Sequence, residues 1–351
     1  MTQIRVQTAV AYDVIIGEGV SSAAPQFVRE ALGRARKVAV VTDSNVGPLY
    51  ADVIARGFAA AGLDPSAFNF PAGERSKNLE TYGKLLDFLA ERRLDRSDVV
   101  VALGGGVTGD LAGFAAATYK RGVAFVQVPT SLLAMVDSSV GGKTGVDLPA
   151  GKNLVGAFHQ PRAVFCDTRF LSSLPDAWRM DGMGEVLKYA ILGDADLFAR
   201  LERMPIEPIG EHEIAGCVAM KRDVVERDER EGGMRKLLNL GHTFAHAIEK
   251  LSGYEVSHGR AVATGIAMVA RAAAKRGMLP AADCARIEAL VLAMGYAART
   301  EFGAADLAAA VLDDKKVSGD AIDLVLPRAI GRCSVERTPL ADIGKVAEDA
   351  L

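Results

Sequence analysis

The signals for secondary structure change character near residue 174 of the sequence. From Lys37 onward, short runs rich in β-branched residues, such as Val99–Leu103, alternate with helical patterns, such as Leu79–Arg92. This alternation is typical of a parallel sheet with helices packed on it. After Leu174, stretches rich in Ala, Leu, Glu, Arg and Met dominate, with one short β-rich return at Ile322–Pro327. We therefore predict an α/β fold class with a Rossmann-like parallel-sheet domain over residues 1–174 and a mostly α-helical domain over residues 175–351.

Composition excludes several classes of protein. The chain has 351 residues, of which half are hydrophobic, and a formal net charge of −3, so it has no basic excess that would attract nucleic acid. The N-terminal segment Met1–Gly19 lacks the basic start and apolar core of a signal peptide. The most apolar long stretch, Ala261–Ala274, is short for a membrane span and is interrupted by Arg271. The four cysteines are scattered, which fits reduced thiols. We expect a cytoplasmic protein without nucleic-acid or membrane partners.

A glycine-rich segment follows the apolar run Val99–Leu103. Gly104, Gly106 and Gly109 have the spacing G-x-G-x-x-G between a strand pattern and a helical pattern, where backbone amides reach a pyrophosphate at a helix N-terminus. No acidic residue ends the next strand pattern, but Asp43 ends the first one. Asp43 is therefore a candidate for the ribose of a dinucleotide, with a turn or helix-cap residue as the alternative. A plain tight turn is the alternative for the glycines.

Two Gly-Lys pairs stand close together in the polar stretch that follows. Lys143 and Lys152 each come directly after a glycine and are flanked by small polar residues. Glycines let a backbone approach an anion, and the ammonium groups supply positive charge. The pattern favours an anion-binding loop over an ordinary solvated loop.

Three of the five histidines fall in one region. His242 and His246 are four residues apart, which places both on one face of a helix, and His258 stands at the start of the next helical pattern. Neutral imidazoles and one carboxylate suit Zn²⁺ and leave a position open for substrate oxygens. Glu185 is the candidate carboxylate, because an acid among apolar residues is costly to bury without a cation. The alternatives are a surface histidine pair and a pairing of Glu185 with Lys188.

Six segments together resemble one known family in both order and spacing: GGGVTGDLAGF, VDSSVGGKTGV, GKNLVGAF, GEVLKYA, LNLGHTFAHAIE and SHG. Over about Val38 to Pro327 the chain resembles the sugar phosphate cyclase superfamily, and within it most closely the 3-dehydroquinate synthases. The resemblance implies an NAD-binding N-terminal α/β domain and a helical C-terminal domain that holds one divalent metal ion, zinc or cobalt.

The resemblance also implies site residues, position by position. The metal ligands would be Glu185, His242 and His258, which leaves His246 to the substrate. Catalytic roles would fall to His246, Lys188, Asn239, Lys143 and Arg235. The substrate-binding positions would be Arg121, Asp137, Lys143, Lys152, Asn153, Lys188, Lys221, Arg235, Asn239, His246 and one of Lys315 or Lys316. The cofactor-binding positions would be Asp43, Glu74, Lys77, Gly105, Gly106, Val107, Thr108, Gly109, Asp110, Thr130, Ser131, Lys143, Lys152, Phe170, Leu171, Ser172 and Ser173.

The implied reaction belongs to the shikimate pathway of aromatic amino acid biosynthesis. It converts 3-deoxy-D-arabino-heptulosonate 7-phosphate, a phosphorylated sugar acid, to 3-dehydroquinate and phosphate. NAD takes up a hydride, phosphate leaves, the hydride returns, and ring opening and an aldol step close the carbocycle, so that NAD is not consumed. The resemblance further implies a homodimer in which Arg121 reaches across the interface.

The sequence departs from the usual family residues at four positions. Ser131, Asp147, Gly184 and Arg260 stand where Thr, Asn, Ala and Glu are usual. Arg260, two residues from His258, replaces a carboxylate that would support this ligand, unless the side chain points to solvent. Three alternatives to the synthase remain open: another sugar phosphate cyclase, a metal-dependent alcohol or glycerol dehydrogenase of related fold, and a regulator that binds NAD without turnover.

Overall fold

The computed structural model describes residues 1–206, 209–312, 317–318 and 320–351. Internal contacts divide the chain into two compact units, here called unit 1 and unit 2. Unit 1 comprises Met1–Arg179 and Gly210–Glu229, and unit 2 comprises Met180–Ile209 and Arg230–Leu351. The chain thus returns to unit 1 once after entering unit 2. A domain boundary at residue 174 stays a prediction.

Unit 1 is built on a seven-stranded sheet in the order β1-β2-β9-β6-β5-β3-β4. All neighbours are parallel except β1 and β2, which pair antiparallel. The strands are β1 (Thr2–Val6), β2 (Tyr12–Gly17), β3 (Lys37–Asp43), β4 (Asp64–Phe70), β5 (Val99–Gly104), β6 (Ala124–Pro129) and β9 (Ala163–Asp167). From β3 the chain moves outward to β4 and returns to β5 on the other side of β3. The carboxyl ends of β3 and β5 therefore flank a topological switch point, where α/β sheets bind ligands.

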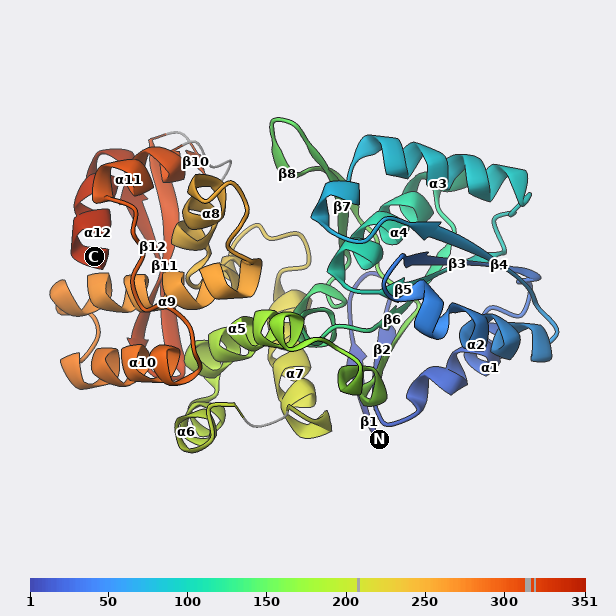
Figure 1. Cartoon of the computed structure of the whole chain (residues 1–351), viewed down its shortest axis with the longest axis horizontal. Helices are drawn as coiled ribbons and strands as arrows, with labels where there is room; N and C mark the ends of the chain where they lie inside the picture. The colour runs from blue at the N-terminus through green and yellow to red at the C-terminus, as the bar shows by residue number, and fades with distance from the viewer. Residues whose placement is uncertain (207–208, 313–316, 319) are drawn as a thin grey trace. The chain divides into compact units, whose positions relative to one another are not determined.

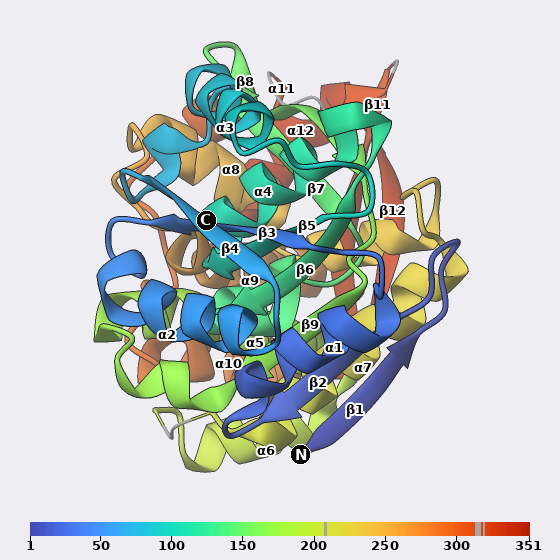
Figure 2. The ribbon, with the colours of Figure 1, turned by 90° about the vertical axis from the view of Figure 1, so that its right-hand side faces the viewer.

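Helices cover both faces of this sheet (Figure 1, Figure 2). The helices α1 (Ala24–Ala31) and α2 (Gly47–Ala60) lie on one face, and α3 (Leu79–Glu91) and α4 (Gly106–Thr118) lie on the other. Double coverage explains why β5 is buried along its whole length and is a continuous apolar run rather than an alternating one. Unit 1 also contains the antiparallel hairpin β7 (Lys143–Leu148) and β8 (Gly151–Phe158), and the helix α7 (Glu211–Arg227), which packs on β1 and β2.

Unit 2 is mostly helical, with one small antiparallel sheet. Its helices are most of α5 (Asp176–Gly193), α6 (Ala195–Arg203), α8 (His242–Leu251), α9 (His258–Lys275), α10 (Ala281–Ala293), α11 (Ala304–Leu312) and α12 (Ile343–Ala350). Its strands are β10 (Val317–Ser318), β11 (Ala321–Ala329) and β12 (Arg332–Pro339), and the predicted β-rich return lies within β11. The helix α9 is almost entirely buried and packs on α8, α10, α12 and β11. Among the described residues, no helix is both long enough and apolar enough to cross a membrane.

Candidate functional site

The glycine turn after β5 leads directly into α4. Gly104 ends the strand, Gly105 precedes the helix and Gly106 begins it. A Cβ on Gly104 would lie 2.4 Å from Thr108 Oγ1, so this close turn requires glycine. No side-chain hydrogen bond caps α4 at this turn, which leaves the amides of its first turn open to an anion. The turn therefore fits the phosphates of a dinucleotide.

Asp43, at the end of β3, lies beside this turn. Its Oδ2 accepts a hydrogen bond from Thr108 Oγ1 at 3.3 Å, and its Oδ1 accepts the amides of Asn45 and Val46 at 2.8 and 3.1 Å. The two amide hydrogen bonds support the turn-residue interpretation of Asp43, and its ribose-binding role stays a prediction.

The end of β6 belongs to the same group. The Thr130 amide donates to Gly104 O at 2.9 Å, and Ser131 Oγ lies 3.3 Å from where a Cβ on Gly105 would stand. The predicted cofactor positions of β3, β5 and β6 are thus brought together at the switch point.

Lys77 is the centre of a buried polar cluster near the start of α4. Its side chain is 5 % exposed, and its Nζ lies 2.5 Å from Asp110 Oδ2 and donates to Asn153 Oδ1 at 2.5 Å. Burial by itself lowers the pKa of Lys77, but the carboxylates of Asp110 and Glu74 outweigh it and raise that pKa. Asp147 accepts the Asn153 amide at 2.7 Å and donates its own amide to Lys77 O at 2.7 Å. The hairpin β7–β8 is thereby attached to the predicted cofactor residues.

Two other predicted lysines of unit 1, Lys152 and Lys221, also face carboxylates. Lys152 Nζ lies 3.6 Å from Glu74 Oε1, so that Lys152 joins the Lys77 cluster. Lys221, on α7, lies 2.8 Å from Asp137 Oδ1 and donates to the Asp137 carbonyl at 2.6 Å. Lys143 begins β7 opposite Phe158.

Two further sets of predicted positions belong to unit 1. Phe170–Ser173 stand against α2, where the Ser173 Oγ is 2.5 Å from the Tyr50 hydroxyl and the Phe170 and Tyr50 rings are 4.6 Å apart. Arg121 follows α4 at the end opposite the glycine turn, is exposed and has a φ of 67°. A 13-residue helix is roughly 20 Å long, so Arg121 lies far from the glycine turn.

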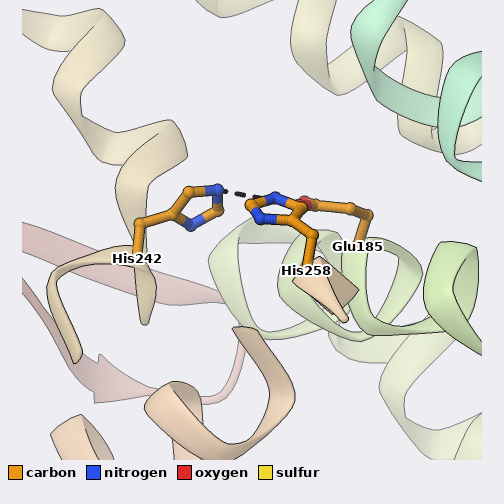
Figure 3. A group of neighbouring side chains, drawn as sticks. All are labelled: Glu185, His242 and His258. Carbon is orange, nitrogen blue, oxygen red and sulfur yellow. Dashed lines mark hydrogen bonds and ion pairs between the residues drawn. The ribbon is translucent and has the colours of Figure 1, made fainter. Parts of the chain in front are cut away.

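Three side chains from three helices converge in unit 2 (Figure 3). Glu185 comes from α5, and His242 and His258 are the first residues of α8 and α9. The Nε2 of His258 lies 3.1 Å from Glu185 Oε1, and the Nε2 of His242 lies 3.6 Å from the same oxygen. One donor atom of each side chain lies within 4.8 Å of the others. The structure thus places the three predicted metal ligands around one point.

The donor set fits a divalent cation. Glu185 is fully buried, and Lys188 Nζ lies 2.5 Å from its Oε2. A second buried carboxylate, Glu249, lies behind His258, with its Oε2 3.5 Å from the Nδ1. Buried carboxylates are stable only with cations and hydrogen bonds beside them. Two imidazoles and a carboxylate are also a standard zinc set.

The helices that carry the ligands touch through glycines. A Cβ on Gly184 would lie 2.1 Å from the Gly259 carbonyl oxygen, and a Cβ on Gly259 would lie 1.7 Å from the Asp181 carbonyl oxygen. The Gly259 amide donates to Asp181 Oδ1 at 2.6 Å. Backbone-on-backbone contact of α5 and α9 therefore sets how near His258 comes to Glu185.

The other predicted residues of unit 2 lie on α8 and on the 3₁₀ turn Met234–Asn239. The His246 and His242 rings are 5.8 Å apart, so His246 stands beside the ligand set but outside it. Arg235 is 1 % exposed, and Asn239 Nδ2 donates to Glu231 Oε1 at 3.2 Å. Lys315 and Lys316 lie outside the described residues.

Sequence reasoning missed two acids that support the ligands. Glu249 lies seven residues after His242, on the same face of α8, and this spacing could have revealed it. Asp181 accepts a hydrogen bond from the Gly259 amide in the first turn of α9, but no local sequence pattern indicates that contact. Arg260 is exposed, which agrees with the solvent-facing alternative, and the carboxylate beside His258 is Glu249 instead.

His258 is expected to make metal uptake depend on pH. Burial lowers the pKa of His258, but hydrogen bonds to Glu185 and Glu249 outweigh burial and raise that pKa to about 10. A protonated imidazole binds no metal, so the ion must displace a proton. We expect the apparent affinity for Zn²⁺ to rise about tenfold per pH unit between roughly pH 6 and 8. Titration against a competing chelator at several pH values measures this slope, and a flat profile would contradict it.

Two family models together match most of the chain. The model described as 3-dehydroquinate synthase N-terminal matches residues 67–180, and the model described as 3-dehydroquinate synthase C-terminal matches residues 182–317. A 3-dehydroquinate synthase of Geobacter metallireducens is 46 % identical over 346 residues, covering 96 % of this chain and 95 % of the relative.

Solved structures of cyclases are similar over the full length. A 2-deoxy-scyllo-inosose synthase in complex with carbaglucose-6-phosphate, NAD⁺ and Co²⁺ has a TM-score of 0.88 and 26 % identity, with full coverage of both chains. A 2-epi-5-epi-valiolone synthase from Streptomyces hygroscopicus with NAD⁺ and Zn²⁺ has a TM-score of 0.87 and 26 % identity, covering 99 % of both chains.

Proposed function

Because the chain belongs to the 3-dehydroquinate synthase family, we propose that it converts 3-deoxy-D-arabino-heptulosonate 7-phosphate to 3-dehydroquinate and phosphate with bound NAD and one divalent metal ion. The observation that carries the proposal is the convergence of Glu185, His242 and His258 in a chain that also has an uncapped glycine turn at a switch point. The enzyme is then a phosphate-eliminating lyase without net redox change. The relatives crystallised with NAD⁺ and with Co²⁺ or Zn²⁺ support both cofactors.

The glycine turn and its neighbours would hold NAD. The first-turn amides of α4 would bind the pyrophosphate, and the carboxylate of Asp43 would accept a ribose hydroxyl. Glu74, Lys77 and Asp110, which belong to the Lys77 cluster, would line the NAD site with polar side chains. When bound, NAD supplies temporary storage of one hydride.

Glu185, His242 and His258 would hold the metal ion, which supplies Lewis-acid polarisation of substrate oxygens. The ammonium group of Lys188 lies beside Glu185. It would offset the carboxylate charge while the charge on the substrate changes during the reaction. His246, one helical turn from His242, presents an imidazole that exchanges a proton with substrate hydroxyls or phosphate.

A set of cations and amides would recognise the phosphate and carboxylate of the substrate. The buried Arg235 offers a planar guanidinium, which suits bidentate binding of either anion. The remaining members are Lys143, Lys152, Asn153, Lys188, Lys221, Asn239, His246 and one of Lys315 or Lys316. Asp137, the other proposed substrate-binding position, is a carboxylate paired with Lys221.

The active form would be a cytoplasmic homodimer. Arg121 is an exposed cation at the end of α4 farthest from the glycine turn, where a second copy of the chain can reach it. The family resemblance assigns it a role across the dimer interface.

Phosphate release tests the proposed function. We expect the purified protein to release one phosphate per seven-carbon substrate with NAD present in catalytic amount, and to stop when a chelator removes the metal and recover when Zn²⁺ or Co²⁺ is returned. Phosphate is measured by a coupled colour reaction and NADH by its absorbance. Accumulation of NADH in step with turnover would indicate a dehydrogenase instead, and turnover only of a substrate without the carboxylate would indicate another cyclase.

A further inference from the structure

His258 has a carboxylate at each of its two ring nitrogens. Its Nε2 lies 3.1 Å from Glu185 Oε1, and its Nδ1 lies 3.5 Å from Glu249 Oε2. Glu249 is 3 % exposed, so its carboxylate is held away from bulk water beside the ring. The two carboxylates come from different helices, α5 and α8, and meet the imidazole on opposite edges.

The other imidazole of the donor set has a different support. The Nδ1 of His242 lies 3.1 Å from the Leu240 carbonyl oxygen, which can only accept a hydrogen bond and therefore selects the tautomer with a proton on Nδ1. Both rings thus turn Nε2 toward Glu185 and Nδ1 toward an acceptor. A charged acceptor makes the opposite nitrogen a stronger donor to a metal than a neutral carbonyl does.

We propose that Glu249 is a positioning residue for metal binding, which accepts the Nδ1 proton of His258 and so keeps the Nε2 lone pair directed at the ion. The assignment rests on the proposed metal site. It also gives α8 two functions two turns apart, because this helix supplies the ligand His242 and the carboxylate that orients the second histidine. Arg260, although only two residues from His258, has no part in this support and remains exposed.

Glu249→Gln and Glu249→Ala separate the positioning role from packing. The amide oxygen of Gln accepts the Nδ1 proton but carries no charge, whereas Ala removes the acceptor. We expect the dissociation constant for Zn²⁺ to rise about 10- to 100-fold in Glu249→Ala and by a smaller factor in Glu249→Gln. The constant is measured on the full chain by competition with a chromophoric chelator, and bound metal is measured by elemental analysis.

Glu255→Gln is the matched control. Glu255 is an exposed acid in the segment before α9, so this variant changes net charge by the same amount without touching the imidazole. Its Zn²⁺ affinity should equal that of the unchanged protein.

Metal-free Glu249→Gln should unfold at the same temperature as the metal-free parent, while the increase in Tm on adding Zn²⁺ should be smaller than in the parent.

The outcomes distinguish this inference from the proposed metal site itself. If the unchanged protein binds no divalent ion, the metal site is wrong. If it binds Zn²⁺ and both Glu249 variants bind within twofold of it, the positioning role is wrong. If Glu249→Ala fails to fold, Glu249→Gln decides alone: unchanged Zn²⁺ affinity would overturn the inference, and weaker affinity with an unchanged metal-free Tm would support it.

Discussion

His242→Ala is expected to remove both the bound metal and the phosphate-releasing activity. The structure offers three donor side chains around one point, and His242 is one of the two imidazoles. Zinc sites with four ligands have binding free energies of about 10–16 kcal/mol, so one ligand is worth roughly 3 kcal/mol, or about two orders of magnitude in affinity. Loss of the Lewis acid should lower kcat by about a thousandfold or more. Metal content after dialysis and the phosphate assay measure the two effects.

His246→Ala is the matched control for this variant. The two histidines lie on one helix with their rings 5.8 Å apart, but His246 is outside the ligand set. His246→Ala should therefore keep its metal while losing activity, because the imidazole is proposed to serve the substrate. A full complement of metal in purified His242→Ala would show that the ligands are misassigned.

Among glycine-to-alanine substitutions near the site, Gly259→Ala is expected to lower the free energy of unfolding the most. Its Cβ would lie 1.7 Å from the Asp181 carbonyl oxygen, a backbone atom that moves only with α5. Overpacking of this kind costs about 1–3 kcal/mol and sometimes more, and we expect about 3 kcal/mol because two helix backbones must separate. His258 adjoins this residue, so metal affinity should fall as well.

The stability effect is measured by urea unfolding of the metal-free protein, followed by helical circular dichroism. Gly344→Ala is the control, since Gly344 lies in α12 of the same unit with no atom within 4 Å of its added Cβ. This control should be neutral or more stable by up to about 1 kcal/mol, because Ala is the better helix former. Equal unfolding midpoints for the two variants would contradict the close contact of α5 and α9.

Local sequence patterns predicted the alternating strands and helices of unit 1. The apolar runs that begin at Val38 and Val99 lie in β3 and β5. They were recognisable because parallel strands covered on both faces are continuously apolar. The proximity of Asp43 to Thr108 could not be read from either segment, since it depends on strand order across the switch point. The contacts of Asn153 and Asp147 with Lys77 likewise depend on where the hairpin β7–β8 folds.

In unit 2 the chemistry of the side chains was more informative than their periodicity. Two histidines on one helical face and a carboxylate in an apolar run indicated a metal. The structure gathers His242 and Glu185 with His258, whereas His246 lies beside this group. The support around them was hidden, because Asp181 and Glu249 act through a distant backbone amide and a distant ring. Hydrogen bonds between residues far apart in sequence leave no periodic signal.

The return of the chain to unit 1 at Gly210–Glu229 limits how the protein can be divided. A fragment that ends at residue 174 or 179 would lack α7, which packs on β1, β2 and the turn Ala134–Ser138, and would leave Asp137 without Lys221. The chain crosses between the units three times, and the first crossing lies inside α5. The residues of the two units therefore alternate along the sequence, and neither unit can be exchanged as one continuous segment. Every substitution in α7 changes unit 1, although α7 follows the first residues of unit 2 in the chain.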